Sequence, residues 1–456
     1  MRLAELQGKR VAVWGCGREG RAALSVLSAR FPRQPVTLFC NEAEAVLFPR
    51  DEEKNLSIDT APPDAATLKR FDIVVKSPGV SAYKPEIAEA EKAGVRFTSG
   101  TALWFVEHAH SRTICVTGTK GKSTVTALIA HLLRRGGKRV ALAGNIGLPL
   151  LELLDIEREP DWWAIELSSF QTRDFDGAPT VAVVNNVYEE HLDWHAARAN
   201  YVADKLRIAA KAQRVVVNAA QPELMALAKS DAHRAFNYAQ GWHVRDGAIW
   251  RGGERTLALA DIPLPGEHNA LNLCAALAAI DAAGIDALAL ARHATSFKAL
   301  PHRLQYLGSR DGVDYVNDSI STTPFAAIEA LRSIGFARAT ILVGGFDRGV
   351  SWAPFVEFVS RHPPHAIVAM GANGEAIAAA LAGIAQPGFL LAAAREFGEA
   401  FARAQALTRA GGAILLSPGA PSFDRFKDYA ERGREFARLA GFDAAAIGTI
   451  DGLGIF

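Results

Sequence analysis

The sequence is poor in cysteine and close to neutral. Its 456 residues include four cysteines, and Cys16, Cys40, Cys115 and Cys274 lie too far apart for the spacing of metal-binding motifs. We expect them to be free thiols, mostly buried, in a reducing compartment, without disulfides. The formal net charge of +1 gives no electrostatic reason to expect nucleic acid or an acidic membrane surface as a partner.

Long apolar runs are absent as well. Stretches such as residues 275–280 are much shorter than the roughly 20 residues that a membrane-spanning helix needs. Residues 1–6 lead into a charged segment and then a strand-like one, without the pattern of a signal peptide. These absences predict a cytoplasmic protein with no membrane insertion.

What is present is the composition of a globular protein in a long chain. Hydrophobic residues make up 49% of the sequence and charged residues 22%. One hydrophobic core does not serve 456 residues, so we expect two or three domains. Strand-like apolar runs alternate with helix-like runs, which predicts α/β architecture with parallel sheets.

The expected strands fall into three groups. They are residues 10–14, 36–39 and 72–75; then 113–116, 162–167 and 181–185; and finally 313–316, 340–343, 366–369 and 413–416. Residues 233–265 are short, glycine-punctuated segments, which predict a small β excursion at the edge of the central domain. With boundaries near 107 and 301, we expect domains at residues 1–106, 107–300 and 301–456.

The most specific motif follows the strand at 113–116. It is a glycine turn that opens a predicted helix, and its residues are Gly118, Thr119, Lys120, Gly121, Lys122, Ser123 and Thr124. Such a turn predicts a phosphate loop, in which the lysine reaches the β and γ phosphates and a hydroxyl binds Mg²⁺. The standard pattern has a glycine where Val116 stands, so the loop is a shortened one. Lys120 is either a second phosphate ligand or a solvated charge.

Two polar clusters end the next strands of this group. Glu166 ends the first, where a Mg²⁺ ligand or a water-holding acid belongs; Ser168 or Ser169 beside it also suits a helix N-cap. The second cluster follows Asn185 and contains His191, a candidate ligand for a second metal ion.

A weaker glycine motif follows the first strand. Gly15, Gly17 and Gly20 form the pattern of a dinucleotide-binding turn, and we expect a helix to begin after it, near Arg21. The second strand ends in Cys40, without the acid that the NAD version uses, so a nucleotide diphosphate fits better. A structural turn without a ligand is the alternative.

The last group of strands has its own polar ends. Arg303, beside the expected boundary, either clamps phosphate on domain closure or is an ordinary surface residue. Residues 318–323 and 417–423 follow strands at the edge where open α/β sheets bind ligands.

In this order, the motifs resemble those of the Mur ligase family, the ATP-dependent amide ligases of peptidoglycan precursor synthesis. The similarity covers essentially the whole chain and is strongest to the branch that adds glutamate to UDP-N-acetylmuramoyl-L-alanine. The matching segments are the glycine turn, 77–80, the phosphate loop, 144–147, 166–171, 190–193, 268–269, 302–303, 317–319 and 416–418. The resemblance implies a Rossmann-like UDP-binding domain, a central P-loop ATPase domain and a Rossmann-like C-terminal domain.

The resemblance also implies roles for individual residues. The uridine diphosphate would be held by Gly15, Cys16, Gly17, Ser77, Pro78 and Gly79, and the muramoyl group by Asn145. ATP would be held by the phosphate loop, Asn272, Arg303 and Asp318. Catalytic residues would be Lys122, Glu166, His191 and Lys205. Two Mg²⁺ ions would be bound through Ser123, Glu166, His191 and a carbamylated Lys205, a residue that the sequence pattern alone does not select.

Departures from the family pattern concentrate where the family binds glutamate. The implied glutamate residues are Thr322, Arg348, Ser422, Phe423 and Tyr429. Arg348 replaces a usual lysine, Ile320 replaces another, and Tyr429 replaces a phenylalanine. These changes favour the variant that adds L-glutamate, whose product a separate epimerase inverts. The standard D-glutamate enzyme is the alternative, and a folylpolyglutamate-type ligase a remoter one. We expect a monomer.

Overall fold

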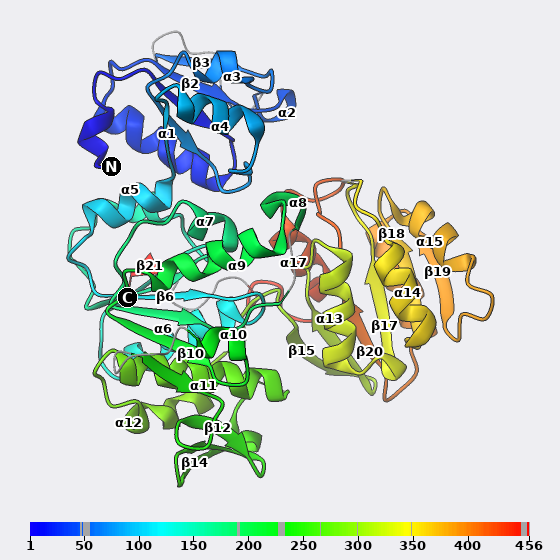
Figure 1. The fold of residues 1–456 in the computed structure, drawn as a ribbon. Helices are drawn as coiled ribbons and strands as arrows, with labels where there is room; N and C mark the ends of the chain where they lie inside the picture. The colour runs from blue at the N-terminus through cyan, green and yellow to red at the C-terminus, as the bar shows by residue number, and fades with distance from the viewer. Residues whose placement is uncertain are drawn as a thin grey trace. The chain divides into compact units, whose positions relative to one another are not determined.

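The computed structural model describes residues 1–45, 48, 55–188, 192–226, 233–264, 266–298, 300–347, 349–447 and 454–455. The chain forms two compact units, each described here by itself (Figure 1). Unit 1 comprises Met1–Phe297 with Gly452–Phe456, and unit 2 comprises Lys298–Asp451. His191 and Arg348, two residues that the sequence singles out, lie outside the described residues.

Unit 1 begins with a five-stranded parallel sheet in the order β3-β2-β1-β4-β5. Its strands are β1 Val11–Trp14, β2 Val36–Phe39, β3 Leu56–Asp59, β4 Ile73–Lys76 and β5 Arg96–Thr98. The helices of this part are η1 Leu3–Leu6, α1 Arg18–Arg30, α2 Glu42–Ala45, α3 Ala65–Leu68, α4 Pro85–Lys92 and α5 Gly100–Glu107. Every residue of β1 and β4 is buried, as expected for parallel strands covered on both faces.

The second sheet of unit 1 has ten strands in the order β14-β13-β12-β11-β10-β9-β6-β8-β7-β21. They are β6 Thr113–Thr117, β7 Val140–Gly144, β8 Trp162–Glu166, β9 Val181–Val184, β10 Arg214–Asn218, β11 His233–Phe236, β12 Trp242–Arg245, β13 Ala248–Arg251, β14 Glu254–Ala258 and β21 Gly454–Ile455. The centre is parallel, whereas β12, β13 and β14 form an antiparallel meander at one edge. This meander confirms the predicted β excursion.

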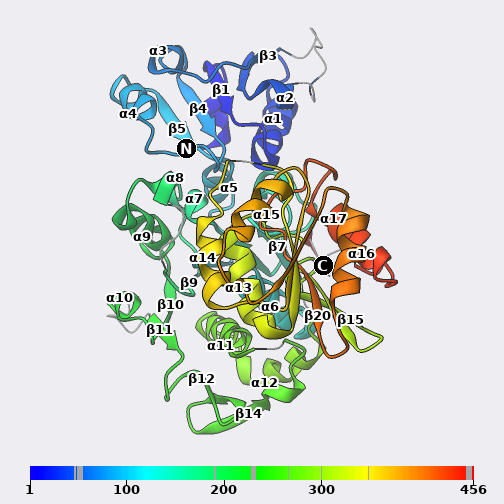
Figure 2. The same ribbon diagram turned by 90° about the vertical axis from the view of Figure 1, so that its right-hand side faces the viewer.

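Helices accompany this sheet, as both views show (Figures 1 and 2). They are α6 Lys122–Arg135, η3 Leu150–Leu153, α7 Ser169–Arg173, α8 Leu192–His195, α9 Arg198–Leu206, η4 Arg207–Ala209, α10 Pro222–Met225, η5 Leu259–Asp261, α11 Glu267–Ala282, α12 Ala287–Ala291 and η6 Arg292–Ser296. Helices α6 and α11 pack against each other, and both are apolar through most of their lengths. Leu128 and Ile129 of α6 and Leu273 and Leu277 of α11 are fully buried. This packing fixes the helix that the phosphate loop opens.

Unit 2 is built on a six-stranded sheet in the order β15-β16-β20-β17-β18-β19, in which only β15 is antiparallel. Its strands are β15 Gln305–Arg310, β16 Val313–Asn317, β17 Ala339–Val343, β18 Ala366–Met370, β19 Leu390–Ala394 and β20 Ala413–Leu416. Its helices are α13 Pro324–Ile334, η7 Phe336–Arg338, α14 Ala353–Arg361, α15 Gly374–Ala382, α16 Phe397–Leu407 and α17 Tyr429–Leu439.

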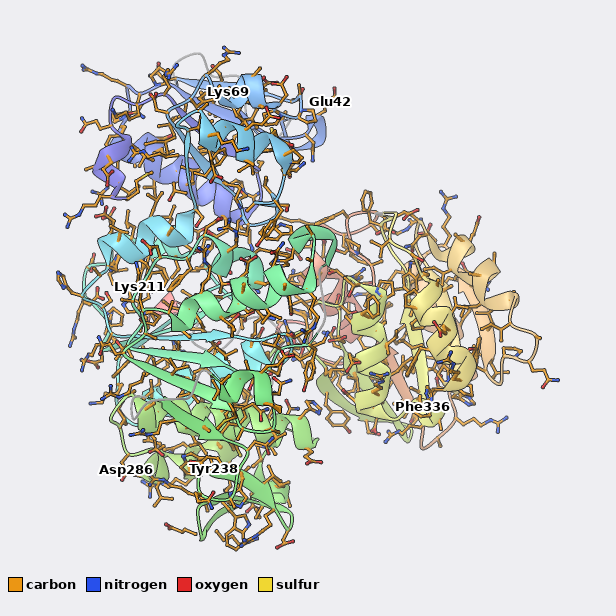
Figure 3. The ribbon with its side chains drawn as sticks, viewed as in Figure 1. Glu42, Lys69, Lys211, Tyr238, Asp286 and Phe336 are labelled. Atoms are coloured by element: carbon orange, nitrogen blue, oxygen red, sulfur yellow. The ribbon has the colours of Figure 1, made fainter. Side chains whose placement is uncertain are left out.

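The sheet of unit 2 has an apolar core on each face. One core includes Ile341 and Phe355, and the other includes Leu342 and Phe436. Phe336, labelled in Figure 3, packs on the first core with its ring 6.5 Å from that of Phe358. Side chains of neighbouring residues on β17 thus face opposite cores, as the two-residue period of a strand requires.

The α/β class with parallel sheets is confirmed. One helix begins earlier than expected: α1 starts at Arg18 instead of near Arg21, because Gly17 is its N-cap and Gly20 already lies inside it. Within the part of the chain that the structure describes, no helix is both long and apolar enough to cross a membrane.

Candidate active site

The phosphate loop lies between β6 and α6, as predicted. Gly121 is the N-cap of α6 and has a φ of +78°, a left-handed conformation that favours glycine. A Cβ at this position would overlap the side-chain amide of Asn272. The amide nitrogens of Thr119 and Lys120 donate to Asn186 Oδ1 at 3.0 and 2.8 Å. The loop is therefore braced by asparagines from the end of β9 and from α11.

The structure brings Asn272 to the phosphate loop from a distant part of the sequence. Asn185 Nδ2 donates to Asn272 Oδ1 at 3.0 Å and to the carbonyl oxygen of Lys120 at 3.0 Å. Both asparagines are buried. Asn272 is thus placed where it can contact a nucleotide phosphate held by the loop.

Glu166 ends β8 next to this loop and is 1% exposed. Its Oε1 accepts a hydrogen bond from Asn145 Nδ2 at 2.7 Å, while its Oε2 is buried and has no hydrogen-bond partner. A buried carboxylate oxygen without a partner is costly unless a ligand or cation completes it. The predicted cap is also present, because Ser168 Oγ accepts from the amide of Gln171 at 3.3 Å.

Lys205 lies on α9 and is buried against the phosphate loop. Its Nζ donates to the carbonyl oxygen of Gly118 at 2.7 Å and lies 4.7 Å from the centre of the Tyr201 ring. The Tyr201 hydroxyl is 2.7 Å from Thr119 Oγ1. Lys122 is partly buried, and its Nζ donates to the carbonyl oxygen of Thr119 at 3.0 Å. Three candidate catalytic residues, Lys122, Glu166 and Lys205, therefore come from elements that meet at this loop.

The fit of a divalent cation can be judged from the donors present. Glu166 offers an unpartnered carboxylate oxygen, and Ser123 offers a buried hydroxyl at the start of α6, both of which are hard oxygen ligands. Among the described residues, no three histidine, cysteine, aspartate or glutamate side chains cluster as a ready-made metal site. The residues present thus suit Mg²⁺ that is held partly by substrate phosphates.

The glycine turn of the first sheet adjoins the segment at 77–79. Ser77 Oγ donates to the carbonyl oxygen of Gly15 at 3.0 Å, and a Cβ at Gly20 would overlap that oxygen. Cys16 is buried, and burial raises the pKa of its thiol. The Arg18 guanidinium donates to the carbonyl oxygen of Gly147 at 2.8 Å and to that of Asn145 at 3.3 Å. The candidate UDP residues and Asn145 are thus parts of one region of unit 1.

In unit 2, Asp318 is a buried carboxyl group at the end of β16. It accepts hydrogen bonds from Ser417 Oγ at 2.7 Å and from the amide of Leu304 at 3.1 Å. Burial raises the pKa of Asp318 to about 6. Arg303 is exposed, and its positive charge lowers the pKa of Asp318, against the larger effect of burial.

Of the candidate glutamate residues that the structure describes, Thr322, Ser422 and Phe423 lie on loops of unit 2, and Tyr429 begins α17. Ser422 is 2% exposed, Thr322 is half-buried, and Phe423 and Tyr429 are exposed. The ring of Phe423 lies 6.4 Å from that of Phe346. These side chains follow β16, β17 and β20, the strands whose carboxyl ends face this edge of the sheet.

Arg432 on α17 joins these loops and is not evident from the sequence. Its guanidinium is 1% exposed and donates to Ser319 Oγ at 3.1 Å and to the carbonyl oxygens of Ser319, Ala420 and Pro421 at 2.9, 3.0 and 3.1 Å. Burial lowers the pKa of Arg432 to about 10, so the group stays charged at neutral pH. No local pattern distinguishes it from the half-buried Arg434 and the exposed Arg438 of the same helix.

Comparisons with known proteins agree with this geometry. The family described as "Mur ligase middle domain" matches residues 116–280. A protein of Xanthomonas euvesicatoria pv. vesicatoria (strain 85-10), named UDP-N-acetylmuramoyl-L-alanine--L-glutamate ligase, is 53% identical over 100% of both chains. A protein of the same name from Micromonospora sp. (strain ATCC 39149 / NRRL 15099 / SCC 1413) is 39% identical over 96% of this chain and 97% of the other.

Solved structures show the same fold at low sequence identity. UDP-N-acetylmuramate-alanine ligase MurC from Thermotoga maritima has a TM-score of 0.59 at 18% identity, covering 95% of this chain and 99% of that one. MurF ligase from Thermotoga maritima in complex with ADP has a TM-score of 0.54 at 14% identity, covering 96% and 94%. With relatives of 39 to 53% identity along almost its entire length, the chain belongs to the Mur ligase family of ATP-dependent ligases.

Proposed function

We propose that this chain joins L-glutamate to the alanyl carboxylate of UDP-N-acetylmuramoyl-L-alanine, with conversion of ATP to ADP and phosphate. The observation that carries the proposal is the buried Glu166, with one unpartnered oxygen, beside a phosphate loop that Lys205 also contacts. The names of the full-length relatives support the substrates. The chain would act as a cytoplasmic monomer with domains at residues 1–106, 107–300 and 301–456.

The reaction needs activation because a carboxylate is a poor electrophile. An oxygen of the alanyl carboxylate attacks the γ-phosphorus of ATP, which forms an acyl phosphate and releases ADP. The glutamate nitrogen then attacks the acyl carbon, and the tetrahedral intermediate expels phosphate as the amide forms. The proton lost by the amine goes to His191 or to a nearby carboxylate.

The proposed ATP site combines the loop with more distant residues. Lys122 and the amides of the loop would bind the phosphates, with Ser123 and Thr124 near the metal. Asn272 would contact the nucleotide from its place beside Gly121. Arg303 and Asp318, both in unit 2, are the other two residues that we propose to bind ATP.

Mg²⁺ would be held by Ser123, Glu166, His191 and Lys205 in its carbamylated form, which turns the amine into a carboxylate-like ligand. Bound there, two such ions would offset the negative charge that builds up when a carboxylate meets a triphosphate. The unpartnered Oε2 of Glu166 supports this assignment.

The proposed substrate contacts extend to both ends of the chain. Gly15, Cys16, Gly17, Ser77, Pro78 and Gly79 would hold the uridine diphosphate, and Asn145 the muramoyl group. Thr322, Arg348, Ser422, Phe423 and Tyr429 would hold glutamate. With L-glutamate as the substrate, a separate epimerase must invert the product if D-glutamate is required downstream.

The experiment is phosphate release from ATP with UDP-N-acetylmuramoyl-L-alanine, run separately with L-glutamate and with D-glutamate. We expect turnover with the L isomer only. Turnover with the D isomer alone would assign the standard specificity and make the changes around Arg348 neutral. Absence of phosphate release with either isomer would contradict the proposed reaction.

A further inference from the structure

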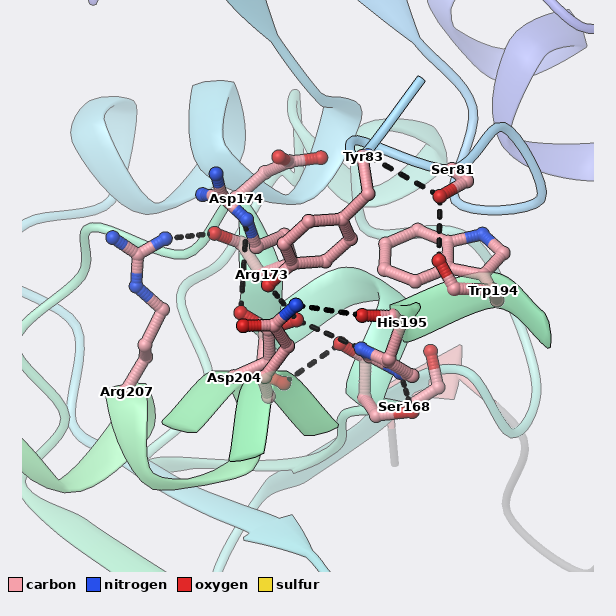
Figure 4. Close-up of polar contacts among 12 residues, drawn as sticks. Ser81, Tyr83, Ser168, Arg173, Asp174, Trp194, His195, Asp204 and Arg207 are labelled. Atoms are coloured by element: carbon pink, nitrogen blue, oxygen red, sulfur yellow. Dashed lines mark hydrogen bonds and ion pairs between the residues drawn. The ribbon is translucent and has the colours of Figure 1, made fainter. Parts of the chain in front are cut away.

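A chain of largely buried hydrogen bonds joins α7, α8 and α9 of unit 1 to the segment that carries Tyr83 (Figure 4). Tyr83 Oη donates to Asp204 Oδ2 at 2.9 Å, His195 Nδ1 lies 2.8 Å from the same oxygen, and His195 Nε2 lies 3.0 Å from Ser169 Oγ. His195 is fully buried, and Asp204 and Ser169 are each 4% exposed. These four residues are called the Tyr83–Ser169 chain below.

The proton positions in the Tyr83–Ser169 chain follow from its acceptors. An ionised carboxylate only accepts hydrogen bonds, so both Tyr83 and His195 Nδ1 donate to Asp204. In the neutral His195 tautomer that carries its proton on Nδ1, Nε2 accepts from the Ser169 hydroxyl 3.0 Å away. Arg173 Nε, 3.6 Å from Asp204 Oδ1, adds a positive charge beside the carboxylate. The buried carboxylate is therefore fully compensated.

The order serine, histidine, aspartate is also that of a hydrolase triad. Here the histidine is enclosed by aromatic rings: Trp194, Tyr201 and Phe170 have their centres 4.5, 5.1 and 5.7 Å from it. Ser169 is buried as well, at the first position of α7. A substrate cannot reach the hydroxyl in this setting, so the arrangement serves to hold elements together.

Three members of the Tyr83–Ser169 chain are close in the sequence to residues of the proposed active site. Ser169 is three residues after Glu166, and Asp204 directly precedes Lys205. Tyr83 is four residues after Gly79, which ends the segment proposed to hold the uridine diphosphate. A second hydrogen bond holds the segment around Tyr83, because Ser81 Oγ donates to the carbonyl oxygen of Trp194 at 2.5 Å.

Helix α9 passes this restraint on to the phosphate loop. Tyr201, Asp204 and Lys205 have the i, i+3, i+4 spacing that places side chains on one face of a helix. Two of them contact the loop, through Thr119 and through the carbonyl oxygen of Gly118. A shift of Asp204 along this face would therefore move Lys205 relative to the loop.

We propose that Tyr83, Asp204 and His195 are positioning residues, which hold Lys205 and the Glu166 strand end in register with the substrate-binding segment at 77–83. The inference rests on the proposed function, because it assigns these residues to the ligase reaction. It predicts that the Tyr83 hydroxyl affects kcat at the phosphate loop, because it holds Asp204 and thereby the neighbouring Lys205.

The test is a double-mutant cycle in kcat, with Tyr83→Phe, Asp204→Asn and the double variant of the full chain. Tyr83→Phe should lower kcat about tenfold and leave KM for ATP within about twofold. Asp204→Asn should lower kcat by at least as much, and the double variant should match Asp204→Asn alone. If Asp204→Asn does not fold, the cycle is run with His195→Gln.

The matched control is Tyr306→Phe, since Tyr306 Oη also donates to an aspartate, Asp314, at 3.1 Å, but in unit 2. It should leave kcat unchanged. An unchanged kcat in Tyr83→Phe, or effects of the two substitutions that simply add, would overturn the proposal while wild-type turnover persists. Failure of the proposed function would show differently, as absence of turnover in the wild type.

Discussion

The phosphate-loop region of unit 1 and the loops at the strand ends of unit 2 differ in how completely they are built. In unit 1 the candidate residues Glu166, Asn272 and Lys205 are buried, and they form hydrogen bonds with Asn145, Asn185 and the carbonyl oxygen of Gly118, respectively. In unit 2 the candidate residue Phe423 is 60% exposed, and the neighbouring Phe346 is 41% exposed. The proposed nucleotide site is thus held by buried hydrogen bonds, whereas the proposed amino-acid site has exposed side chains above the buried Arg432.

The largest effect should come from the braced region. Glu166→Gln keeps the shape and the Asn145 contact but removes the charge that we propose to hold a cation, so kcat should fall about 10²- to 10³-fold. The measurement is steady-state phosphate release, with Glu254→Gln on the exposed edge strand β14 as control. A kcat within threefold of the wild type would show that this carboxylate has no role in the chemistry.

Substitution of Arg432 tests whether its buried hydrogen bonds hold the loops of the proposed glutamate site. Lysine keeps the charge but cannot reach four acceptors at once, so Arg432→Lys should raise KM for glutamate about tenfold and lower the melting temperature. KM for ATP should stay within about twofold. Arg438→Lys is the control, because Arg438 lies on the same helix with its side chain 63% exposed. Equal effects on all three substrates would point to general destabilisation instead.

The pH dependence of stability separates two buried groups of unit 2. Burial raises the pKa of Asp318 from 3.8 to about 6, so between these values the folded state binds more protons and the free energy of unfolding falls as pH rises. Burial lowers the pKa of His302 from 6.5 to about 4, so over that range the unfolded state binds more protons and stability rises with pH.

Asp318→Asn should therefore remove a decrease of about 3 kcal/mol between pH 4 and pH 7. His302→Gln should remove an increase of similar size. The measurement is urea unfolding of both variants and the wild type at pH 4, 5, 6 and 7. If the two variants change the pH dependence of the free energy of unfolding in the same direction, the assignment of a raised pKa to Asp318 and a lowered pKa to His302 is wrong.

The smallest effect on stability is expected from substitution of Phe423, whose ring is exposed in the proposed glutamate site. Phe423→Ala should change the free energy of unfolding by less than about 0.5 kcal/mol, because so little of the ring is buried. It should nevertheless raise KM for glutamate several-fold if the ring contacts the amino acid. Unchanged glutamate kinetics would place this ring outside the binding site.

The sequence predicts local motifs well because their physical requirements are local. The glycine turn at Gly118 to Gly121, the acid that ends β8 and the alternation of strands and helices all depend on residues close together in the chain. Strand ends could be placed within one or two residues for the same reason. The start of α1 was expected too late, because Gly20, the last glycine of the motif, lies inside the helix that begins at Arg18.

Residues whose role depends on distant partners could not be found in this way. Lys205 is an ordinary helical lysine in the sequence, and only packing of α9 on the loop brings its Nζ to Gly118. Tyr83, His195, Asp204 and Arg432 carry no local signal either, because their partners lie between 9 and 121 residues away along the chain. The resemblance to a family supplied Lys205 but none of these four.

The sequence by itself determined the α/β class, the phosphate loop and the chemistry that a lysine, a hydroxyl and an acid at strand ends can perform. Those properties follow from turn geometry, apolar periodicity and the nature of each side chain. Only the tertiary structure decided which polar groups share a buried environment: Asn145 with Glu166, Tyr83 with Asp204, and Arg432 with two loops. The reason is physical: in a buried, low-dielectric setting a polar group must find its partner in space, and the spacing along the chain does not record where that partner lies.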